Sequence, residues 1–176
     1  QMESLSRQTI YDLQSSLSEE LAEDYFGSAT TFVAAEIDQI TRKAKILSVG
    51  DSRAYLIDTK GNWQQITQDH SILSELLSDF PDKKEEDFAT IYGGVSSCLV
   101  ADYSEFQDKI FYQEIEIQQG ESLLLCSDGL TDGLSVEVRE KIWKQYDNDK
   151  SRLTVYRKLI EKQRFYDDLS VIICAF

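Results

Sequence analysis

The chain has 176 residues, 41% of them hydrophobic and 11% aromatic, and this composition with a single proline argues against disorder. It predicts one domain over residues 1–176 that can bury a core. The formal net charge of −14 argues against nucleic acid and anionic membranes as partners, since both attract clustered lysine and arginine.

The chain lacks features that would place it outside the cytoplasm. No apolar run approaches the roughly 18 residues of a membrane span, and no signal peptide is visible. Cys98, Cys126 and Cys174 are far apart, without CxxC spacing, which argues against zinc and disulfides. We therefore expect a reduced, cytoplasmic protein in which Cys126 and Cys174 are buried, because both lie within apolar runs.

The first half of the chain predicts a helix followed by short strands. Apolar residues at helical spacing over 10–21 indicate the helix, and Gly27 is expected to end it. The predicted strands, joined by tight turns into an antiparallel meander, cover 30–37, 46–49, 54–57 and 63–66. Asp69 is expected to cap a short helix over 71–77. His70, at the start of that helix, is expected to have a capping or packing role rather than to act as a general acid.

The second half begins with a loop-like region and ends with helices between strands. Residues 78–97 are rich in charge and in turn formers, so we expect a variable, flap-like segment there. Apolar patterns then predict strands over 111–118, 123–126 and 169–176, and helices over 135–146 and 153–160. About eight strands and four helices with mostly short connections favour an α+β fold of antiparallel sheets covered by helices.

Carboxylates gather where the predicted strands end. Asp51 and Asp128 each follow an apolar run at a glycine-marked turn, Asp132 follows closely, and the pair Asp167–Asp168 precedes the last strand. Oxygen ligands held by a stiff sheet are suited to Mg²⁺ or Mn²⁺. Taken alone, Asp51 and Asp128 are each better explained as ordinary turn residues than as ligands, and Arg53 is expected to pair with a nearby carboxylate.

Five segments resemble, in order, the motifs of the type 2C, metal-dependent protein phosphatases. They are residues 27–37 (GSATTFVAAEI), 49–57 (VGDSRAYLI), 65–71 (QITQDHS), 120–134 (GESLLLCSDGLTDGL) and 167–173 (DDLSVII). Any one of these segments is a weak signal, and their shared order is a specific one. The resemblance implies a sandwich of two antiparallel β-sheets flanked by helices, with a binuclear Mg²⁺ or Mn²⁺ centre at one end.

The same resemblance implies roles for individual carboxylates. Asp128 and Asp167 match two of the carboxylates around the binuclear centre, whereas Asp51 and Asp132 match positions linked to a third, weaker metal. The implied reaction is hydrolysis of phosphoserine or phosphothreonine in proteins by a metal-activated water, with no phosphoenzyme. A phosphoprotein substrate and a Ser/Thr kinase signalling system are the partners that this activity implies.

The sequence also departs from the family pattern. The Arg…Asn-Glu-Asp strand and the Asp-Gly-x-Gly-Gly segment, which supply a bridging aspartate in the family, are absent, so we expect an N-terminally incomplete fold. Asp168 stands where asparagine is usual, and Arg164-Phe165-Tyr166 stands where small residues are usual. Bulky residues there could narrow the approach to the metals.

Two other functions remain open at this point. One is a catalytically inactive phosphatase-like domain that binds a phosphoprotein or another partner. The missing segments favour it, and the four retained carboxylates oppose it, because an inactive site has no need of mutually repelling charges. The other is a non-enzymatic acidic ion-binding module, which Ca²⁺ binding without phosphatase activity would support.

Overall fold

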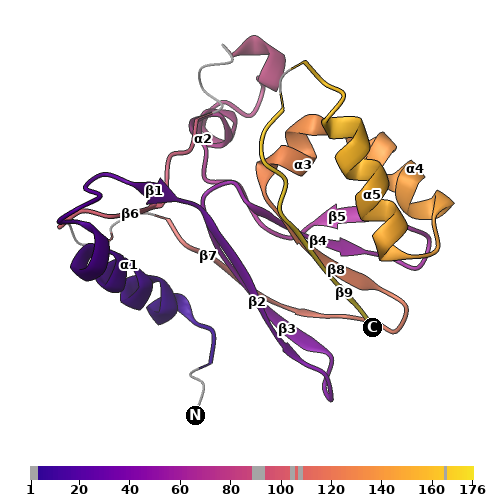
Figure 1. Cartoon of the computed structure of the whole chain (residues 1–176), viewed down its shortest axis with the longest axis horizontal. Coiled ribbons are helices and arrows are strands. Elements are labelled where there is room, and N and C mark those ends of the chain that lie inside the picture. Colours follow the sequence, from indigo (N-terminus) through magenta and orange to yellow (C-terminus); the bar gives the residue numbers. More distant parts are fainter. Residues whose placement is uncertain (1–3, 89–93, 104–105, 107–108, 165) are drawn as a thin grey trace.

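The structure is a computed structural model, and it describes residues 4–88, 94–103, 106, 109–164 and 166–176 (Figure 1). In chain order, the described elements are α1 (Arg7–Leu21), β1 (Ala29–Thr30), β2 (Phe32–Asp38), β3 (Lys43–Val49), β4 (Arg53–Ile57), β5 (Trp63–Gln65), α2 (Ile72–Asp79), the 3₁₀ helix η1 (Glu85–Asp87), β6 (Leu99–Val100), β7 (Phe111–Glu116), β8 (Ser122–Cys126), α3 (Asp128–Gly133), α4 (Val136–Gln145), α5 (Asp149–Ile160) and β9 (Val171–Ala175).

The strands form two main antiparallel sheets. One has three strands in the order β2-β3-β7, and the other has four in the order β5-β4-β8-β9, while β1 pairs with β6. Every pair among these described strands is antiparallel. The α+β fold with antiparallel sheets and helices that the sequence predicts is confirmed.

The two main sheets pack face to face around a shared apolar layer. Ala44 and Ile46 from β3 meet Ala54 from β4 and Leu123 from β8 in one buried cluster. Side chains alternate between the faces of a strand, so the next residue on β8, Leu124, joins a different cluster on the outer face of its sheet. The core is therefore a sandwich whose strands bury side chains on both faces.

Helices cover the outer face of each sheet (Figure 1). Ile142 and Trp143 of α4 and Tyr156 of α5 belong to the cluster on the outer face of the four-stranded sheet. On the other side, Ile10 of α1 packs with Leu47 of β3. The result is four layers in the order helix, sheet, sheet, helix.

Three predictions of local structure are wrong. The first helix ends at Leu21, and Gly27 lies in the following loop, where its N–H donates to the carbonyl of Ala101 at 2.8 Å. The strand predicted over 30–37 is interrupted at Thr31, because β1 pairs with β6 whereas β2 pairs with β3. The segment from Asp128, predicted as a turn, is the short helix α3.

The two cysteines predicted to be buried differ from each other. Cys126 on β8 is buried, and burial raises the pKa of its thiol to about 12. Cys174 on β9 is only half-buried, so that prediction is wrong. The difference follows from position, since β8 has a strand on each side and β9, among the described strands, pairs with β8 alone.

Two other predicted segments fall partly outside the described residues. The flap-like segment 78–97 includes residues 89–93, which the structure does not describe, and its described parts contain the end of α2, η1 and an isolated bridge between Ser71 and Val95. The bulky segment 164–166 includes Phe165, which also lies outside. No helix within the described ranges has both the length and the apolar character needed to cross a membrane.

Candidate functional site

Strand register brings the predicted site residues to one end of the four-stranded sheet. Arg53 on β4 lies opposite Cys126 on β8, and Cys126 lies opposite Val171 on β9. Asp51 lies two residues before β4 begins and Asp128 lies two residues after β8 ends. Because β4 and β8 are adjacent and antiparallel, both aspartates lie at the same end of the sheet. The loop that enters β9 with Asp167 reaches the same end.

The turn that carries Asp51 depends on the preceding glycine. Gly50 has a φ of +99°, a backbone conformation that residues with a side chain rarely adopt. A Cβ at Gly50 would lie 2.4 Å from the side chain of Thr31. The hydroxyls of Thr31 and Ser52 are hydrogen-bonded at 2.8 Å across this turn. Close packing of the start of β2 on the turn therefore fixes the backbone that presents Asp51.

The loop before β9 packs directly on the start of α3. A Cβ at Gly129 would lie 2.3 Å from the carbonyl oxygen of Asp168, so only glycine permits this approach. The hydroxyl of Ser127 donates to the same carbonyl at 3.1 Å and accepts the N–H of Ser170 at 3.1 Å. These contacts hold the Asp167 loop against the helix that begins at Asp128.

The carboxylates at this end of the sheet interact electrostatically. Burial, and then the negative charge of Asp128, raises the pKa of Asp51. Burial and the charge of Asp128 also raise the pKa of Asp132, with smaller contributions in the same direction from Asp69 and Asp167. The four predicted ligands therefore lie within one negative field, in which ionisation of some members is opposed by the others.

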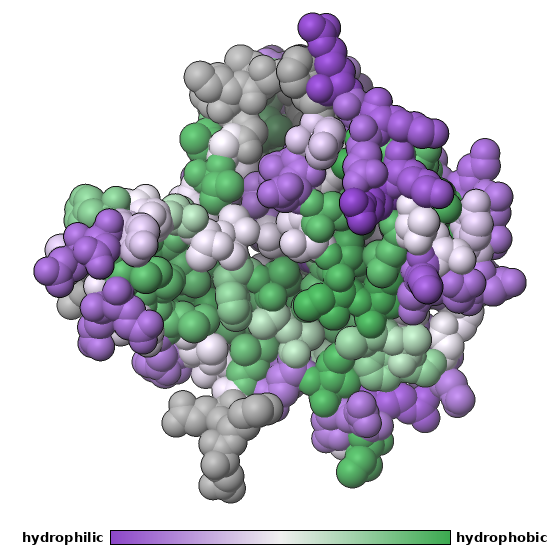
Figure 2. Space-filling model, viewed as in Figure 1, coloured by the Kyte–Doolittle hydropathy of each residue, from purple (hydrophilic) through white to green (hydrophobic). Residues whose placement is uncertain are grey.

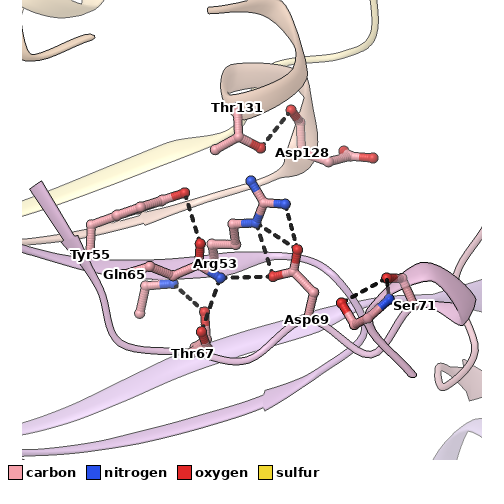
Figure 3. Close-up of polar contacts among 10 residues, drawn as sticks. Arg53, Tyr55, Gln65, Thr67, Asp69, Ser71, Asp128 and Thr131 are labelled. Atoms are coloured by element: carbon pink, nitrogen blue, oxygen red, sulfur yellow. Dashed lines mark hydrogen bonds and ion pairs between the residues drawn. The ribbon is translucent and has the colours of Figure 1, made fainter. Parts of the chain in front are cut away.

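Arg53 and Asp69 form a pair beside these carboxylates (Figure 3). The Nε of Arg53 lies 2.9 Å from each carboxylate oxygen of Asp69, and Gln65 Nε2 donates to the same carboxylate at 2.9 Å. The expected pairing of Arg53 with a carboxylate is confirmed. Asp69 is not the cap of α2, which was the prediction, because the side chain of Ser71 accepts the N–H of Ser74 there at 3.1 Å.

His70 is buried behind the Asp51 turn. The N–H of Gly50 donates to Nδ1 of His70 at 3.1 Å, and the N–H of His70 donates to the carbonyl of Gly50 at 2.9 Å. These two bonds tie the turn to the segment before α2. Their arrangement supports the predicted packing role of His70.

The donor chemistry of this end fits a divalent cation. Carboxylate oxygens are the ligands that Mg²⁺ and Mn²⁺ prefer, and a bound cation would relieve the repulsion among them. Within the ranges that the structure describes, no three His, Cys, Asp or Glu side chains converge closely enough to hold a metal ion. The described carboxylates thus provide suitable donors and only part of a coordination shell.

Sequence reasoning missed Asp69 as a member of this region. Its charge contributes to the raised pKa of both Asp51 and Asp132. Asp69 lies far from the other carboxylates along the chain and near a helix start, so a capping role was the simplest local interpretation. The available signal was its position in the segment 65–71, which is the first of the family-like segments after the Asp51 turn.

A four-layer α+β sandwich with carboxylates gathered at one end defines the class of the type 2C phosphatases. The family model for protein phosphatase 2C matches residues 2–158, which is most of the chain. The chain therefore belongs to the protein phosphatase 2C family.

Individual relatives agree with this assignment. The serine/threonine phosphatase stp of Listeria innocua serovar 6a is 36% identical over 121 residues, covering 69% of this chain and 46% of that protein. A solved structure described as a bacterial serine phosphatase is 26% identical, with a TM-score of 0.77, and the match covers 95% of this chain and 66% of that one. Stp1 from Staphylococcus aureus is 25% identical with a TM-score of 0.77, covering 99% and 71%. The chain spans about half the length of the curated relatives it matches.

Proposed function

We propose that this chain carries the catalytic end of a protein serine/threonine phosphatase that hydrolyses phosphoserine and phosphothreonine in proteins. The supporting observation is that Asp51, Asp128, Asp132 and Asp167 come from separate segments and share one negative field at one end of the sandwich. Unfavourable clustering of charge at one place is typical of functional sites.

The proposed roles follow the positions of the carboxylates. Asp128 begins α3 and Asp167 lies in the loop packed on that helix, and we assign these two to the main metal centre. Asp51 and Asp132 are assigned to a further, weaker metal. Bound Mg²⁺ or Mn²⁺ would supply an activated water and positive charge for the phosphoryl oxygens. The same fold is described as holding two manganese ions in the catalytic domain of the phosphatase PstP, which is 24% identical to this chain.

The surrounding residues would keep these ligands in place. Arg53 and Gln65 hold Asp69 beside the site, and His70 ties the Asp51 turn to the adjacent segment. Ser127 and Gly129 set the distance between α3 and the Asp167 loop. With the phosphorylated protein as substrate, a Ser/Thr kinase that makes such substrates is the proposed signalling partner, and the cytoplasm is the proposed location.

The proposal is tested by Mn²⁺-dependent phosphate release from a phosphothreonine peptide. Asp128→Asn should abolish release, because it removes a charged ligand with almost no change of shape. Asp12→Asn, a substitution on the exposed face of α1, is the matched control and should leave release unchanged. Release that persists in Asp128→Asn would remove Asp128 from the site.

A second candidate is a phosphatase-like domain that binds a phosphoprotein without hydrolysing it. It is favoured by the incomplete convergence of metal-binding side chains among the described residues. Binding of the phosphothreonine peptide with no release of phosphate at any Mn²⁺ concentration would support this second function.

A further inference from the structure

A groove of about 600 Å³ lies beside α1. Among the described residues, α1 contributes Tyr11, Ser15 and Ser18 to its lining, and Tyr103 and Phe106, which follow β6, form the other wall. None of these residues belongs to the candidate functional site at the end of the four-stranded sheet.

The floor of the groove is held by a side chain of α1 that bonds to β6. Gln14 is buried, and its amide pairs with the backbone of Val100: Nε2 donates to the carbonyl at 2.6 Å, and Oε1 accepts the N–H at 3.1 Å. The hydroxyl of Ser18 donates to the carbonyl of Gln14 at 3.0 Å. These bonds fix α1 against β6, so the groove is formed before any ligand binds.

Aromatic rings stand on both walls of the groove. Tyr11 and Phe106 meet edge to face with their ring centroids 5.9 Å apart, and the centroids of Phe26 and Tyr103 are 6.2 Å apart. Tyr11 is 44% exposed and Tyr103 is 72% exposed. Ring faces that are open to solvent attract cations, and above all the flat guanidinium group.

The groove is also acidic. Glu19 and Glu23 line it, and residues 8–26 contain five acidic residues and no lysine or arginine. Among the described residues, no basic side chain forms an ion pair with Glu19 or Glu23. Figure 2 shows hydrophilic side chains gathered around α1, at the left of the view. The groove thus combines open ring faces with negative charge that no cation neutralises.

The spacing of the two carboxylates matches an extended peptide. Glu19 and Glu23 are four positions apart, which is about 6 Å along a helix axis. The helical turn continues past Leu21 here, because the N–H of Tyr25 donates to the carbonyl of Leu21 at 2.7 Å. Alternate residues of an extended strand lie on one face and are about 6.6 Å apart. Two alternate side chains of an extended segment can therefore reach both carboxylates.

We propose that this groove binds an extended, arginine-rich segment of a partner protein, in which alternate arginines pair with Glu19 and Glu23 and stack on the rings of Tyr11 and Tyr103. Arginine fits both features of the groove. Its guanidinium group is flat, forms bidentate pairs with carboxylates, and is hydrated weakly enough to stack on a ring. Lysine would satisfy the charges and leave the ring faces largely unused.

Other occupants fit the groove less well. A second copy of the chain would bring a net charge of −14 to an acidic surface, and nucleic acid or an anionic membrane would be repelled for the same reason. A wholly apolar segment would cover the hydroxyl of Ser15 and the carboxylates of Glu19 and Glu23 without offering them partners. Charge complementarity therefore selects a basic segment.

The proposal is tested with the whole chain and a synthetic peptide of alternating arginine and serine, about eight residues long so that it spans the groove. Calorimetry at low ionic strength measures the affinity, and backbone amide shifts in NMR spectra locate the site. We expect shifts at residues 11–23 and 103. The same peptide with lysine in place of arginine should bind at least about threefold more weakly, because lysine stacks poorly on a ring.

Glu19→Gln combined with Glu23→Gln is the informative variant, because it removes both charges with almost no change of shape. It should weaken binding of the arginine peptide at least about fivefold. Glu116→Gln combined with Asp147→Asn removes the same charge from exposed sites on β7 and between α4 and α5, and it should change the affinity less than about twofold. Tyr103→Ser should remove the preference for arginine over lysine.

Three results would overturn the proposal: equal weakening by the two double variants, equal affinity for the arginine and lysine peptides, or a dimer of the chain alone that the arginine peptide dissociates. The first would show attraction to the overall charge of the chain, the second a site for any polycation, and the third a second copy as the occupant. No phosphate release is measured, so these outcomes are independent of the proposed phosphatase activity.

Discussion

Neighbouring strands β8 and β9 are both rich in apolar residues and differ greatly in environment. Both have five residues and no charge, and Ser122 at the start of β8 is the one polar residue among them. Leu124 on β8 has no exposed surface, whereas Ile172 on β9 is 62% exposed. β8 pairs with β4 and β9, and β9 pairs with β8 alone among the described strands.

The comparison shows that an apolar strand pattern identifies the strand and not its neighbours. Burial of a strand depends on what covers its edges and faces, which is a property of the whole assembly. β8 has a paired strand along both of its edges, as an apolar strand requires. Among the described strands, β9 has a paired strand along one edge only. Experiments that treat the two strands alike should therefore give very different results.

The largest expected difference is in the reactivity of the two cysteines. Cys126 is buried and its pKa of about 12 keeps the thiol protonated, so it should react with iodoacetamide only through unfolding. Cys174 is half-buried on the edge strand and should react in the folded state. For a domain of ordinary stability we expect at least about a thousandfold difference in rate. Pulse alkylation with peptide mass spectrometry measures both sites, and equal rates in native buffer would contradict the comparison.

The next largest difference is in the cost of removing a side chain. Leu124→Ala should lower the free energy of unfolding by about 2–5 kcal/mol, because it leaves a cavity in the buried cluster under α4 and α5. Ile172→Ala should change it by less than about 0.5 kcal/mol, since the side chain is mostly in solvent. Urea denaturation of both variants is the measurement. A cost of several kcal/mol for Ile172→Ala would mean that the side chain of Ile172 is buried in solution.

Much of this fold was predictable from local pattern. Alternation and turn residues locate β3, β4, β7 and β8, and helical spacing locates α1, α4 and α5, because these elements bury the faces that their patterns mark. The division of residues 30–37 at Thr31 was not predictable, since it depends on the pairing of β1 with the distant β6. The half-exposed state of Cys174 has the same cause, because no local signal says that β9 is an edge.

The candidate site was predictable to a different degree. The resemblance located Asp51, Asp128, Asp132 and Asp167, and register explains why these residues share one end of the sheet. The position of Asp69 could not be read from its neighbours, because its partner Arg53 is 16 residues away in the chain. The assignment of the four carboxylates found by resemblance to metal ions stays a prediction.

A third test compares this partly buried ion pair with an exposed one. Arg53 lies on β4 opposite Cys126, and the side chains of Arg53 and Asp69 are 22% and 14% exposed. Arg53→Gln should lower the free energy of unfolding by about 1–3 kcal/mol, because Asp69 loses its charged partner. Arg157→Gln removes an exposed pair with Glu161 on α5 and should cost less than about 0.5 kcal/mol. Similar costs for the two variants would mean that the Arg53 pair is solvated in solution.

The smallest expected effect is a gain in stability at the site. Burial and neighbouring negative charge raise the pKa of Asp132, so its ionised form is less favourable in the folded chain than in the unfolded chain. Without metal, Asp132→Asn should therefore raise the free energy of unfolding at neutral pH, by less than about 1 kcal/mol because the group is partly solvated. The gain should disappear as the pH falls below the ordinary range for aspartate, where the unaltered residue is neutral in both states. Thermal unfolding in EDTA across pH 3–7 measures it.

Asp58 provides a control of opposite sign. The N–H groups of Asn62 and Lys60 donate to its carboxylate at 2.9 and 2.8 Å, and they lower its pKa. Its ionised form therefore stabilises the fold above the ordinary aspartate range, and that contribution is lost as the pH falls through the lowered pKa. Asp58→Asn should reduce stability at neutral pH, where Asp132→Asn increases it. Stabilisation of both variants would show general relief of the chain's negative charge, whereas opposite signs would locate the unfavourable charge at the candidate site.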